Sequence, residues 1–246
     1  MNEPVAGTYT ATMDSGTIVL LPAFNEAAHI EEVIAGVYRA ASGANVVVVD
    51  DGSSDGTGDR ARSAGATVVR MPTNMGYGVA LQAGYKYAMR EGAEYVVQLD
   101  ADGQHDPISI PGLVERVARG DIDLCIGSRF LEGESYAIPA ARRVGMILFR
   151  RIASKVLGTT ITDPTSGYQA MNRRVVEFYC RDAYPTDYPD VNVLVMLHRH
   201  GFRIAELPVE MFASADNKSI HAGVRPAYYL FKMGLDIPLN LLRREH

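Results

Sequence analysis

The sequence predicts an α/β protein with a mostly parallel central sheet and helices on both faces. Apolar runs alternate along the first half with segments whose apolar residues recur at helical spacing, which is typical of parallel sheets. The run Val46, Val47, Val48 and Val49 has no polar alternation, which indicates a strand covered on both faces. Both observations favour one domain with the sheet in its core.

The expected elements follow in a regular order. The expected strands of the first half are residues 17–22, 45–49, 66–71, 94–99 and 121–126. Helices are expected over residues 27–40 and 79–90, and from near Asp59 and Pro107. After Arg129 come a Gly- and Glu-rich loop, a basic helical stretch at 140–157, the turn TDPTSG with a short strand, a helix near 191–199 and a strand at 202–211. No linker or repeat divides the chain, so we expect one domain at residues 1–223 and an amphipathic segment at 224–246.

Composition narrows the class of protein. A chain of 246 residues with 47% hydrophobic residues can form a sizeable core, and a formal net charge of -5 argues against a nucleic-acid partner. Cys125 and Cys180 have no zinc-site spacing and suit a reducing compartment. We see neither a signal peptide nor an apolar run of about 18 residues, so we expect a cytoplasmic protein.

Acids, amides and one arginine directly follow the expected strands. In open parallel sheets, ligands bind outside the carboxyl ends of the strands. The segments at those ends are PAFNE, DDGSSDGT, DADGQHD and GSRF. We therefore expect a ligand site at this edge.

Asp100, Asp102 and Gln104 alternate, and an extended segment would point all three side chains the same way. Carboxylate and amide oxygens suit Mg²⁺ or Mn²⁺. The alternative is a solvated acidic turn in which an aspartate caps the helix that begins near Pro107.

Asp50 and Asp51 end the valine strand, and one of them is enough to form an Asx turn and cap the next helix. The second acid could accept hydrogen bonds from a nucleobase N–H or from ribose hydroxyls. The later stretch NMGYG lacks the third glycine of a dinucleotide fingerprint and follows the third strand, which excludes a Rossmann dehydrogenase.

Six motifs in order resemble the family 2 glycosyltransferases with the GT-A fold, over roughly residues 17–221: PAFNEAAHI, VVDDGSSDGT, NMGYGVALQAG, QLDADGQHDP, GSRF and DPTSGYQAMNRR. They are most similar to the branch typified by dolichol-phosphate mannosyltransferase and bacterial polyprenyl-phosphate glycosyltransferases. The resemblance implies a GT-A fold and a metal-dependent, inverting transfer of a hexose from a UDP- or GDP-sugar to a polyprenyl phosphate.

The resemblance also implies residue roles. The nucleotide-sugar would be bound by Pro22, Phe24, Glu26, Asp50, Asp51 and Asp100. The cation, Mg²⁺ or Mn²⁺, would be held by Asp100, Asp102 and Gln104. The acceptor phosphate would be bound by Arg129, Arg143 and Lys218, and catalysis would involve Asp102, Asp163 and Arg129.

The chemistry fits these assignments. Breaking the bond from sugar to diphosphate leaves negative charge that a cation stabilises. An acceptor phosphate is already an anionic nucleophile and needs an arginine fork more than a strong base. We expect Arg142, Arg150 and Arg151 to form only a solvated helix face.

Asp163 keeps two interpretations. It could orient the acceptor or act as a base for a hydroxyl, or it could belong to an ordinary turn. An indispensable Asp163 with a dispensable Arg143 would favour a saccharide or protein hydroxyl as acceptor. A nucleotidyltransferase lacks support because no Gly-rich basic loop follows the first strand, and the intact acids argue against a non-catalytic nucleotide-sugar binding protein.

The last part of the chain departs from the family pattern. The loop FASADNKSIHAG has no arginine, and Lys218 and His221 are the available substitutes. The segment at residues 224–246 could lie in a membrane interface, dock on its own domain or form a homodimer. Peripheral membrane contact and a second subunit both stay open.

Overall fold

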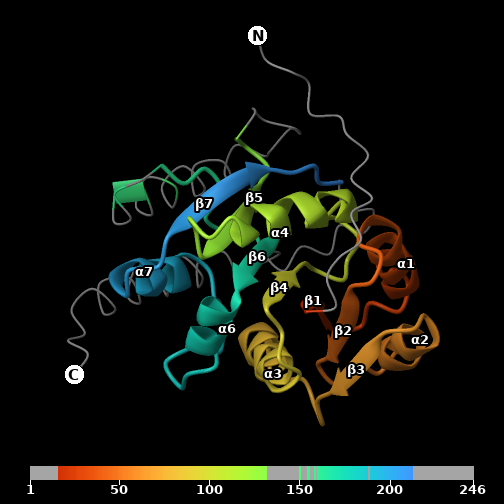
Figure 1. Ribbon diagram of the computed structural model, residues 1–246. Coiled ribbons are helices and arrows are strands. Elements are labelled where there is room, and N and C mark those ends of the chain that lie inside the picture. Colours follow the sequence, from red (N-terminus) through yellow and green to blue (C-terminus); the bar gives the residue numbers. More distant parts are fainter. Residues whose placement is uncertain are drawn as a thin grey trace, which may run out of the picture.

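A mixed sheet forms the centre of the fold (Figure 1). The computed structural model describes residues 16–131, 150, 154, 155, 158, 160–187 and 189–212. These residues contain a seven-stranded sheet in the order β3-β2-β1-β4-β6-β5-β7. Its strands are β1 (Thr17–Ala23), β2 (Asn45–Asp50), β3 (Thr67–Arg70), β4 (Tyr95–Gln98), β5 (Leu124–Ser128), β6 (Gln169–Asn172) and β7 (Ile204–Pro208).

Neighbouring strands are mostly parallel, as predicted, and β6 is the exception. β1 pairs in parallel with β2 and β4, β2 with β3, and β5 with β7. β6 runs antiparallel to its neighbours β4 and β5, so Gln169 at its start lies opposite Gln98 and Ile126 near their ends. This reversal brings the preceding turn, residues 162–167, to the edge where β4 and β5 finish.

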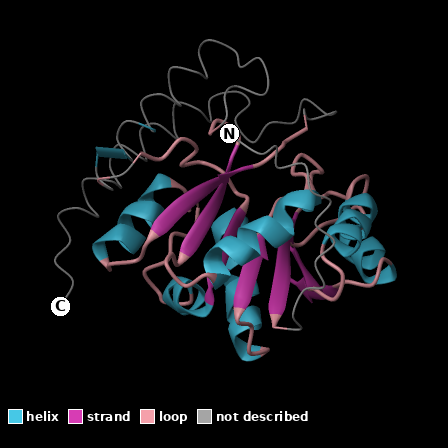
Figure 2. Ribbon diagram, turned by 45° about the horizontal axis from the view of Figure 1, so that its top comes forward, coloured by secondary structure: helices cyan, strands magenta, loops and turns pink. Residues whose placement is uncertain are grey.

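Helices cover both faces of the sheet. Those among the described residues are α1 (Ile30–Ala40), α2 (Thr57–Ser63), α3 (Tyr77–Arg90), α4 (Ile110–Ala118), α6 (Arg173–Tyr179) and α7 (Val191–Arg199), with the 3₁₀ turn η1 (Pro107–Ser109) before α4. One apolar layer packs α1, α2 and α4 on the sheet, and a second packs α3, α6 and α7 on it. Figure 2 shows helices in front of the strands and behind them.

The valine run contributes to both layers. Val46 and Val48 belong to the layer that contains α1, α2 and α4, whereas Val47 and Val49 belong to the layer that contains α3, α6 and α7. Successive strand residues point to opposite faces, so a strand covered on both faces has no position for a solvated polar residue. The prediction from the unbroken run is confirmed.

Sequence and structure differ mainly in the second half. The helix α6 was not predicted, because seven residues are too few for a clear periodic signal. Its start is fixed by Asn172, whose side chain accepts a hydrogen bond of 3.2 Å from the backbone N–H of Val175. The strand predicted at residues 121–126 forms only from Leu124 and extends to Ser128. Most of the basic stretch at 140–157 lies outside the described residues.

No helix in the described part of the chain is long and apolar enough to cross a membrane. The segment at residues 224–246 lies outside that part. The domain boundary at residue 223 stays a prediction.

Candidate active site

A cavity of about 560 Å³ lies at the carboxyl ends of β1, β2 and β4. Its wall comes from the ends of these strands and the segments after them, from the segment between β3 and α3 with the first turn of α3, and from the loop between α6 and α7. The lining residues are Pro22, Ala23, Phe24, Glu26, Asp51, Asn74, Gly76, Tyr77, Ala80, Asp100, Ala101, Asp102 and Asp187. The lining therefore includes Pro22, Phe24, Glu26, Asp51, Asp100 and Asp102, all of which were candidates from the sequence.

Asp51 is held rigidly at the cavity wall. Its side chain accepts hydrogen bonds from the backbone N–H groups of Met75 at 2.8 Å and Gly76 at 3.0 Å. Only 4% of the residue is exposed. Two backbone donors fix the orientation of a carboxylate, so its remaining lone pairs have a fixed direction for a ligand.

Asp50 does not line the cavity, although the sequence analysis placed it in the nucleotide-sugar site. It is fully buried, and its Oδ1 accepts a hydrogen bond of 2.9 Å from the backbone N–H of Ser53. Its Oδ2 lies 3.5 Å from Nε of Arg70 and against Gly58 of α2. Asp50 is therefore the acid that forms the turn, and Asp51 is the one that faces the cavity.

The acidic segment after β4 is a turn rather than an extended chain. Gly103 has a φ of 75°, a left-handed conformation that suits glycine. Gln104 donates its backbone N–H to Asp102 at 3.0 Å, and its side-chain amide also donates to Asp102. The expected alternation of three parallel side chains is therefore wrong as a geometric argument. Asp100 and Asp102 still line the cavity, whereas Gln104 is not among the lining residues and donates its hydrogen bonds to Asp102.

The two acids fit a divalent cation. The described residues contain no group of three or more His, Cys, Asp or Glu that would hold a metal by themselves. Burial, with the adjacent charge of Asp100, raises the pKa of Asp102. A carboxylate whose ionisation is disfavoured by burial and by a neighbouring acid gains from a bound cation, which favours its charged form. Oxygen-only donors of this kind suit Mg²⁺ or Mn²⁺.

Asp100 is positioned by two side chains that the sequence analysis did not single out. Tyr77 donates its hydroxyl to Oδ1 at 2.8 Å, and Nε2 of His105 lies 3.3 Å from Oδ2. Burial alone would raise the pKa of Asp100, but His105, Tyr77 and the charge of Arg129 outweigh it and lower that pKa. Burial and the charge of Asp100 raise the pKa of Tyr77, so its hydroxyl stays protonated and donates.

A hydrogen-bond chain continues from Tyr77 into the core. Gln98 donates from Nε2 to the Tyr77 hydroxyl at 3.1 Å, and Oε1 of Gln98 accepts the hydroxyl of the buried Tyr85. A polar residue at the end of a buried strand is the signal that could have identified this chain in the sequence, because Gln98 needs partners in the core.

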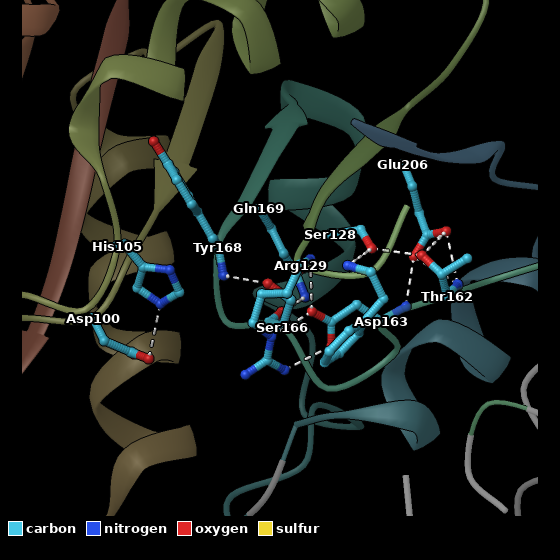
Figure 3. Close-up of polar contacts among 11 residues, drawn as sticks. Asp100, His105, Ser128, Arg129, Thr162, Asp163, Ser166, Tyr168, Gln169 and Glu206 are labelled. Carbon is cyan, nitrogen blue, oxygen red and sulfur yellow. Dashed lines mark hydrogen bonds and ion pairs between the residues drawn. The ribbon is translucent and has the colours of Figure 1, made fainter. Parts of the chain in front are cut away.

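Arg129 and Asp163 form one ion-paired unit, as Figure 3 shows. Nε and Nη2 of Arg129 lie 2.6 Å and 2.7 Å from the two oxygens of Asp163, and the backbone N–H of Arg129 adds a contact of 3.2 Å. Asp163 is 1% exposed. The sequence analysis proposed both residues for catalysis, and the structure brings them together at the ends of β5 and of the turn before β6.

Gly167 joins this unit to the acids of the cavity. A Cβ at Gly167 would lie 3.1 Å from Oδ2 of Asp100 and 3.2 Å from the hydroxyl of Tyr77. Any larger residue would crowd Asp100, so the glycine of TDPTSG serves close approach rather than backbone conformation. The turn thus contacts Asp100 at one end and Arg129 at the other.

Two further observations complete the site. Asp187, from the loop between α6 and α7, lines the cavity and was missed, because nothing in the sequence indicates that this loop reaches the ends of the first strands. Arg143 and Lys218, which the sequence analysis assigned to the acceptor phosphate, lie outside the described residues.

The family model described as Glycosyl transferase family 2 matches residues 18–180. The chain belongs to glycosyl transferase family 2. This family 2 enzyme has the GT-A fold that its motifs predict, and its activity as a glycosyltransferase is confirmed at the level of the family.

Curated relatives of this family 2 enzyme include proteins named for lipid-phosphate acceptors. It is 31% identical over 202 residues to the polyprenol monophosphomannose synthase of Mycolicibacterium smegmatis, covering 78% of this chain and 76% of the relative. It is 32% identical over 203 residues to the undecaprenyl-phosphate mannosyltransferase of Micrococcus luteus, covering 78% and 82%. The recognised resemblance to the lipid-phosphate branch is therefore confirmed.

A solved structure shares the fold. Glucosyl-3-phosphoglycerate synthase from Mycobacterium tuberculosis, in complex with Mn²⁺ and UDP-glucose, matches with a TM-score of 0.67 and 23% sequence identity, over 90% of this chain and 79% of that one. At this identity the match concerns the fold alone.

Proposed function

We propose that the protein is an inverting, divalent-metal-dependent glycosyltransferase that moves a hexose from a UDP- or GDP-sugar to a polyprenyl phosphate. The observation that carries this proposal is that Asp51, Asp100 and Asp102 converge on one cavity at the carboxyl edge of the sheet. The relatives named for polyprenol and undecaprenyl phosphates support the acceptor class.

The donor nucleotide would occupy the part of the cavity beside β1 and β2. Asp51 is fixed there by two backbone N–H groups and can accept from a base N–H or a ribose hydroxyl. Phe24, which is 45% exposed, offers an aromatic face to the base, and Pro22 and Glu26 complete this wall.

The diphosphate would lie against Asp100 and Asp102, which would hold the cation, and Gln104, hydrogen-bonded to Asp102, remains a candidate third ligand. A bound Mg²⁺ or Mn²⁺ supplies Lewis-acid stabilisation of the charge on the leaving diphosphate. The protein's own contribution is orientation: Tyr77 and His105 hold Asp100, and Gln104 holds Asp102.

The acceptor phosphate would meet Arg129. The planar guanidinium is a favourable phosphate ligand, and Asp163 fixes its plane through two contacts. Because both oxygens of Asp163 accept from Arg129, this carboxylate is better placed to orient the arginine than to act as a base for a hydroxyl. This pairing favours a phosphate over a saccharide or protein hydroxyl as acceptor, and Arg143 and Lys218 remain candidates for further contacts.

The donor can be tested by titration calorimetry of the purified protein with UDP, GDP, CDP and ADP, each with and without Mn²⁺. We expect UDP or GDP to bind, and to bind much more tightly with Mn²⁺. Equal binding of all four nucleotides, or binding that ignores Mn²⁺, would contradict the donor and metal assignments.

The acceptor can be tested with polyprenyl phosphate and the matching polyprenol, both in detergent, at equal concentration with the donor that calorimetry selects. We expect a glycolipid product only from the phosphate, and its anomeric configuration, read by NMR, should be opposite to that of the donor. Equal transfer to the free alcohol would instead favour a hydroxyl acceptor.

A further inference from the structure

We propose that Glu206 is a positioning residue that holds the Arg129–Asp163 pair in place. Glu206 lies on β7, where it pairs in register with Ile126 of the parallel strand β5. It is half-buried, it does not line the cavity, and the sequence analysis gave it no role. Figure 3 shows its carboxylate directed toward Thr162 and Asp163.

The hydrogen bonds of the Glu206 carboxylate fix the turn that carries Asp163. Oε1 of Glu206 accepts from the backbone N–H groups of Thr162 at 2.8 Å and Asp163 at 2.7 Å. Oε2 accepts from the same N–H of Thr162 at 2.7 Å and from its hydroxyl at 2.9 Å. Hydrogen bonds to a carboxylate are roughly twice as strong as neutral ones, so one side chain fixes two successive peptide groups.

A chain of hydrogen bonds connects Glu206 to the segment that carries Arg129. The Thr162 hydroxyl gives its proton to Glu206, so it can only accept from the Ser128 hydroxyl, whose oxygen lies 2.5 Å away. The oxygen of Ser128 in turn accepts the backbone N–H of Phe130 at 3.2 Å. Ser128 and Phe130 flank Arg129, so both partners of the ion pair are anchored through Glu206.

The geometry distinguishes positioning from direct chemistry. Each oxygen of Glu206 already accepts two hydrogen bonds from the protein, which leaves it unsuited to act as a base. Without Glu206, the N–H groups of Thr162 and Asp163 lose their acceptor, and the turn is free to move. A bidentate pair needs both partners in one plane, so we expect such movement to disturb the guanidinium of Arg129.

The direct test is the ¹H–¹⁵N NMR signal of the Arg129 Nε–H group, assigned by its disappearance in Arg129→Lys. In Glu206→Ala we expect this signal to move toward that of a solvated arginine and to exchange faster with water. Glu206→Gln keeps one oxygen for the two backbone donors, so the Arg129 signal in this variant should lie between the Arg129 signals of Glu206→Ala and wild type. Glu210→Ala, which removes an exposed glutamate four residues away, is the matched control and should leave the signal unchanged.

A kinetic split provides the second readout and rests on the proposed function. Glu206→Ala should lower kcat/KM for polyprenyl phosphate by about tenfold to a hundredfold, because small displacements of positioned groups have effects of this size. The Kd of the nucleotide with Mn²⁺ should change by less than about twofold. Partial recovery of kcat/KM in Glu206→Gln would support positioning by hydrogen bonds.

Several results would overturn the proposal. An unchanged Arg129 signal in Glu206→Ala would do so, whatever happens to turnover. If Glu206→Ala does not fold, Glu206→Gln carries the test, and a wild-type Arg129 signal in that variant would count equally against the proposal. The NMR measurement requires no polyprenyl phosphate or other substrate. The positioning role of Glu206 can therefore fail while the proposed reaction stands, and the proposed reaction can fail while the positioning role stands.

Discussion

Asp50 and Asp51 are neighbours of the same chemical type that serve different purposes. Asp50 turns toward α2 and binds the backbone of Ser53, whereas Asp51 turns toward the cavity and is held by Met75 and Gly76. At the end of a strand, successive side chains point to opposite faces, so only one of two adjacent acids can reach a given site. Residue type alone therefore predicts that an acid is needed here and does not decide which one binds the ligand.

Replacement of Asp102 tests the metal site at the scale of one side chain. We expect Asp102→Ala to abolish Mn²⁺-dependent nucleotide binding and turnover, because one of the two carboxylates after β4 that would hold the cation is lost. The fold should be retained, since burial and the charge of Asp100 already disfavour the ionised form of Asp102 without a cation. Calorimetry with and without Mn²⁺ measures the loss.

The control for this variant is Asp59→Ala, which removes an exposed acid at the start of α2. Its nucleotide affinity should equal that of the wild type. Retained Mn²⁺ dependence in Asp102→Ala would remove Asp102 from the metal site.

Gly167→Ala tests the contact between the turn and the acids. The added methyl group would meet Oδ2 of Asp100 at 3.1 Å, a tight contact that the carboxylate can relieve only by shifting. We expect weaker Mn²⁺-dependent nucleotide binding, by about tenfold, with a free energy of unfolding within about 1 kcal/mol of wild type.

The matched control is Gly112→Ala in α4, where the new Cβ would meet a Leu207 methyl at an ordinary 3.4 Å. Alanine should stabilise this helix slightly and leave binding unchanged. Equal binding by both variants and wild type would show that the Gly167 contact has no role in the site.

At the scale of elements, the loop after β2 depends on close packing of two backbone segments. Gly52 has a φ of 71°, and a Cβ there would collide with the backbone of Thr73 and Asn74. Gly56 in the same loop has a φ of 90°, yet a Cβ there would meet nothing within 4 Å. Replacement of Gly56 therefore tests the cost of the left-handed backbone alone, whereas replacement of Gly52 tests that cost together with a steric clash.

We expect Gly56→Ala to lower the free energy of unfolding by about 1 kcal/mol through the left-handed backbone alone. Gly52→Ala should lower the free energy of unfolding by about 3 kcal/mol or more. This variant should also weaken nucleotide binding, because the displaced segment at 73–76 carries the backbone N–H groups that donate to Asp51. Urea denaturation and calorimetry measure both effects. Equal losses in the two variants would contradict the close-packing argument.

Asp123 joins several elements of the second half. Its Oδ1 accepts from Asn172 and Arg174, each at 3.0 Å, and its Oδ2 accepts from the backbone N–H of Arg203 at 2.9 Å. Burial alone would raise the pKa of Asp123, but the hydrogen bonds from Arg203 and Asn172 outweigh it and the pKa is lowered. The folded protein therefore binds a proton at Asp123 less readily than the unfolded chain does.

Because its pKa is lower in the folded protein, Asp123 stabilises the fold at pH values above its unfolded-state pKa of about 4. This stabilisation is lost as the pH falls through the lower pKa of the folded state. We expect Asp123→Asn to lower the free energy of unfolding by about 2 kcal/mol near neutral pH, with a smaller deficit at about pH 4. Urea denaturation at both pH values measures this. Asp121→Asn, which breaks an exposed pair with Arg116, should have a smaller effect, and a pH-independent deficit in Asp123→Asn would contradict the assignment.

At the scale of the molecule, the sequence predicted the features that depend on residues close together in the chain. The alternating runs gave the parallel sheet and both helical layers, and the acids at strand ends gave the cavity wall. The antiparallel course of β6, the approach of Asp187 to the cavity and the contacts of Glu206 depend on residues far apart in the chain. The extended alternation assumed for Asp100, Asp102 and Gln104 does not form, because the left-handed turn at Gly103 interrupts it.

Ligand binding should stabilise the described domain as a unit, because the cavity joins the ends of three strands, α3 and the loop before α7. A ligand present at about 100 times its Kd adds about 2.7 kcal/mol to the free energy of unfolding, which corresponds to an increase in Tm of about 5 to 10 °C for a domain of this size. We expect this increase with Mn²⁺ plus either UDP or GDP, and only a small shift with either component alone. Asp102→Ala should lose the joint effect while it keeps the Tm of the free protein. Equal shifts with and without Mn²⁺, measured by differential scanning calorimetry, would mean that nucleotide binding does not use the two acids after β4.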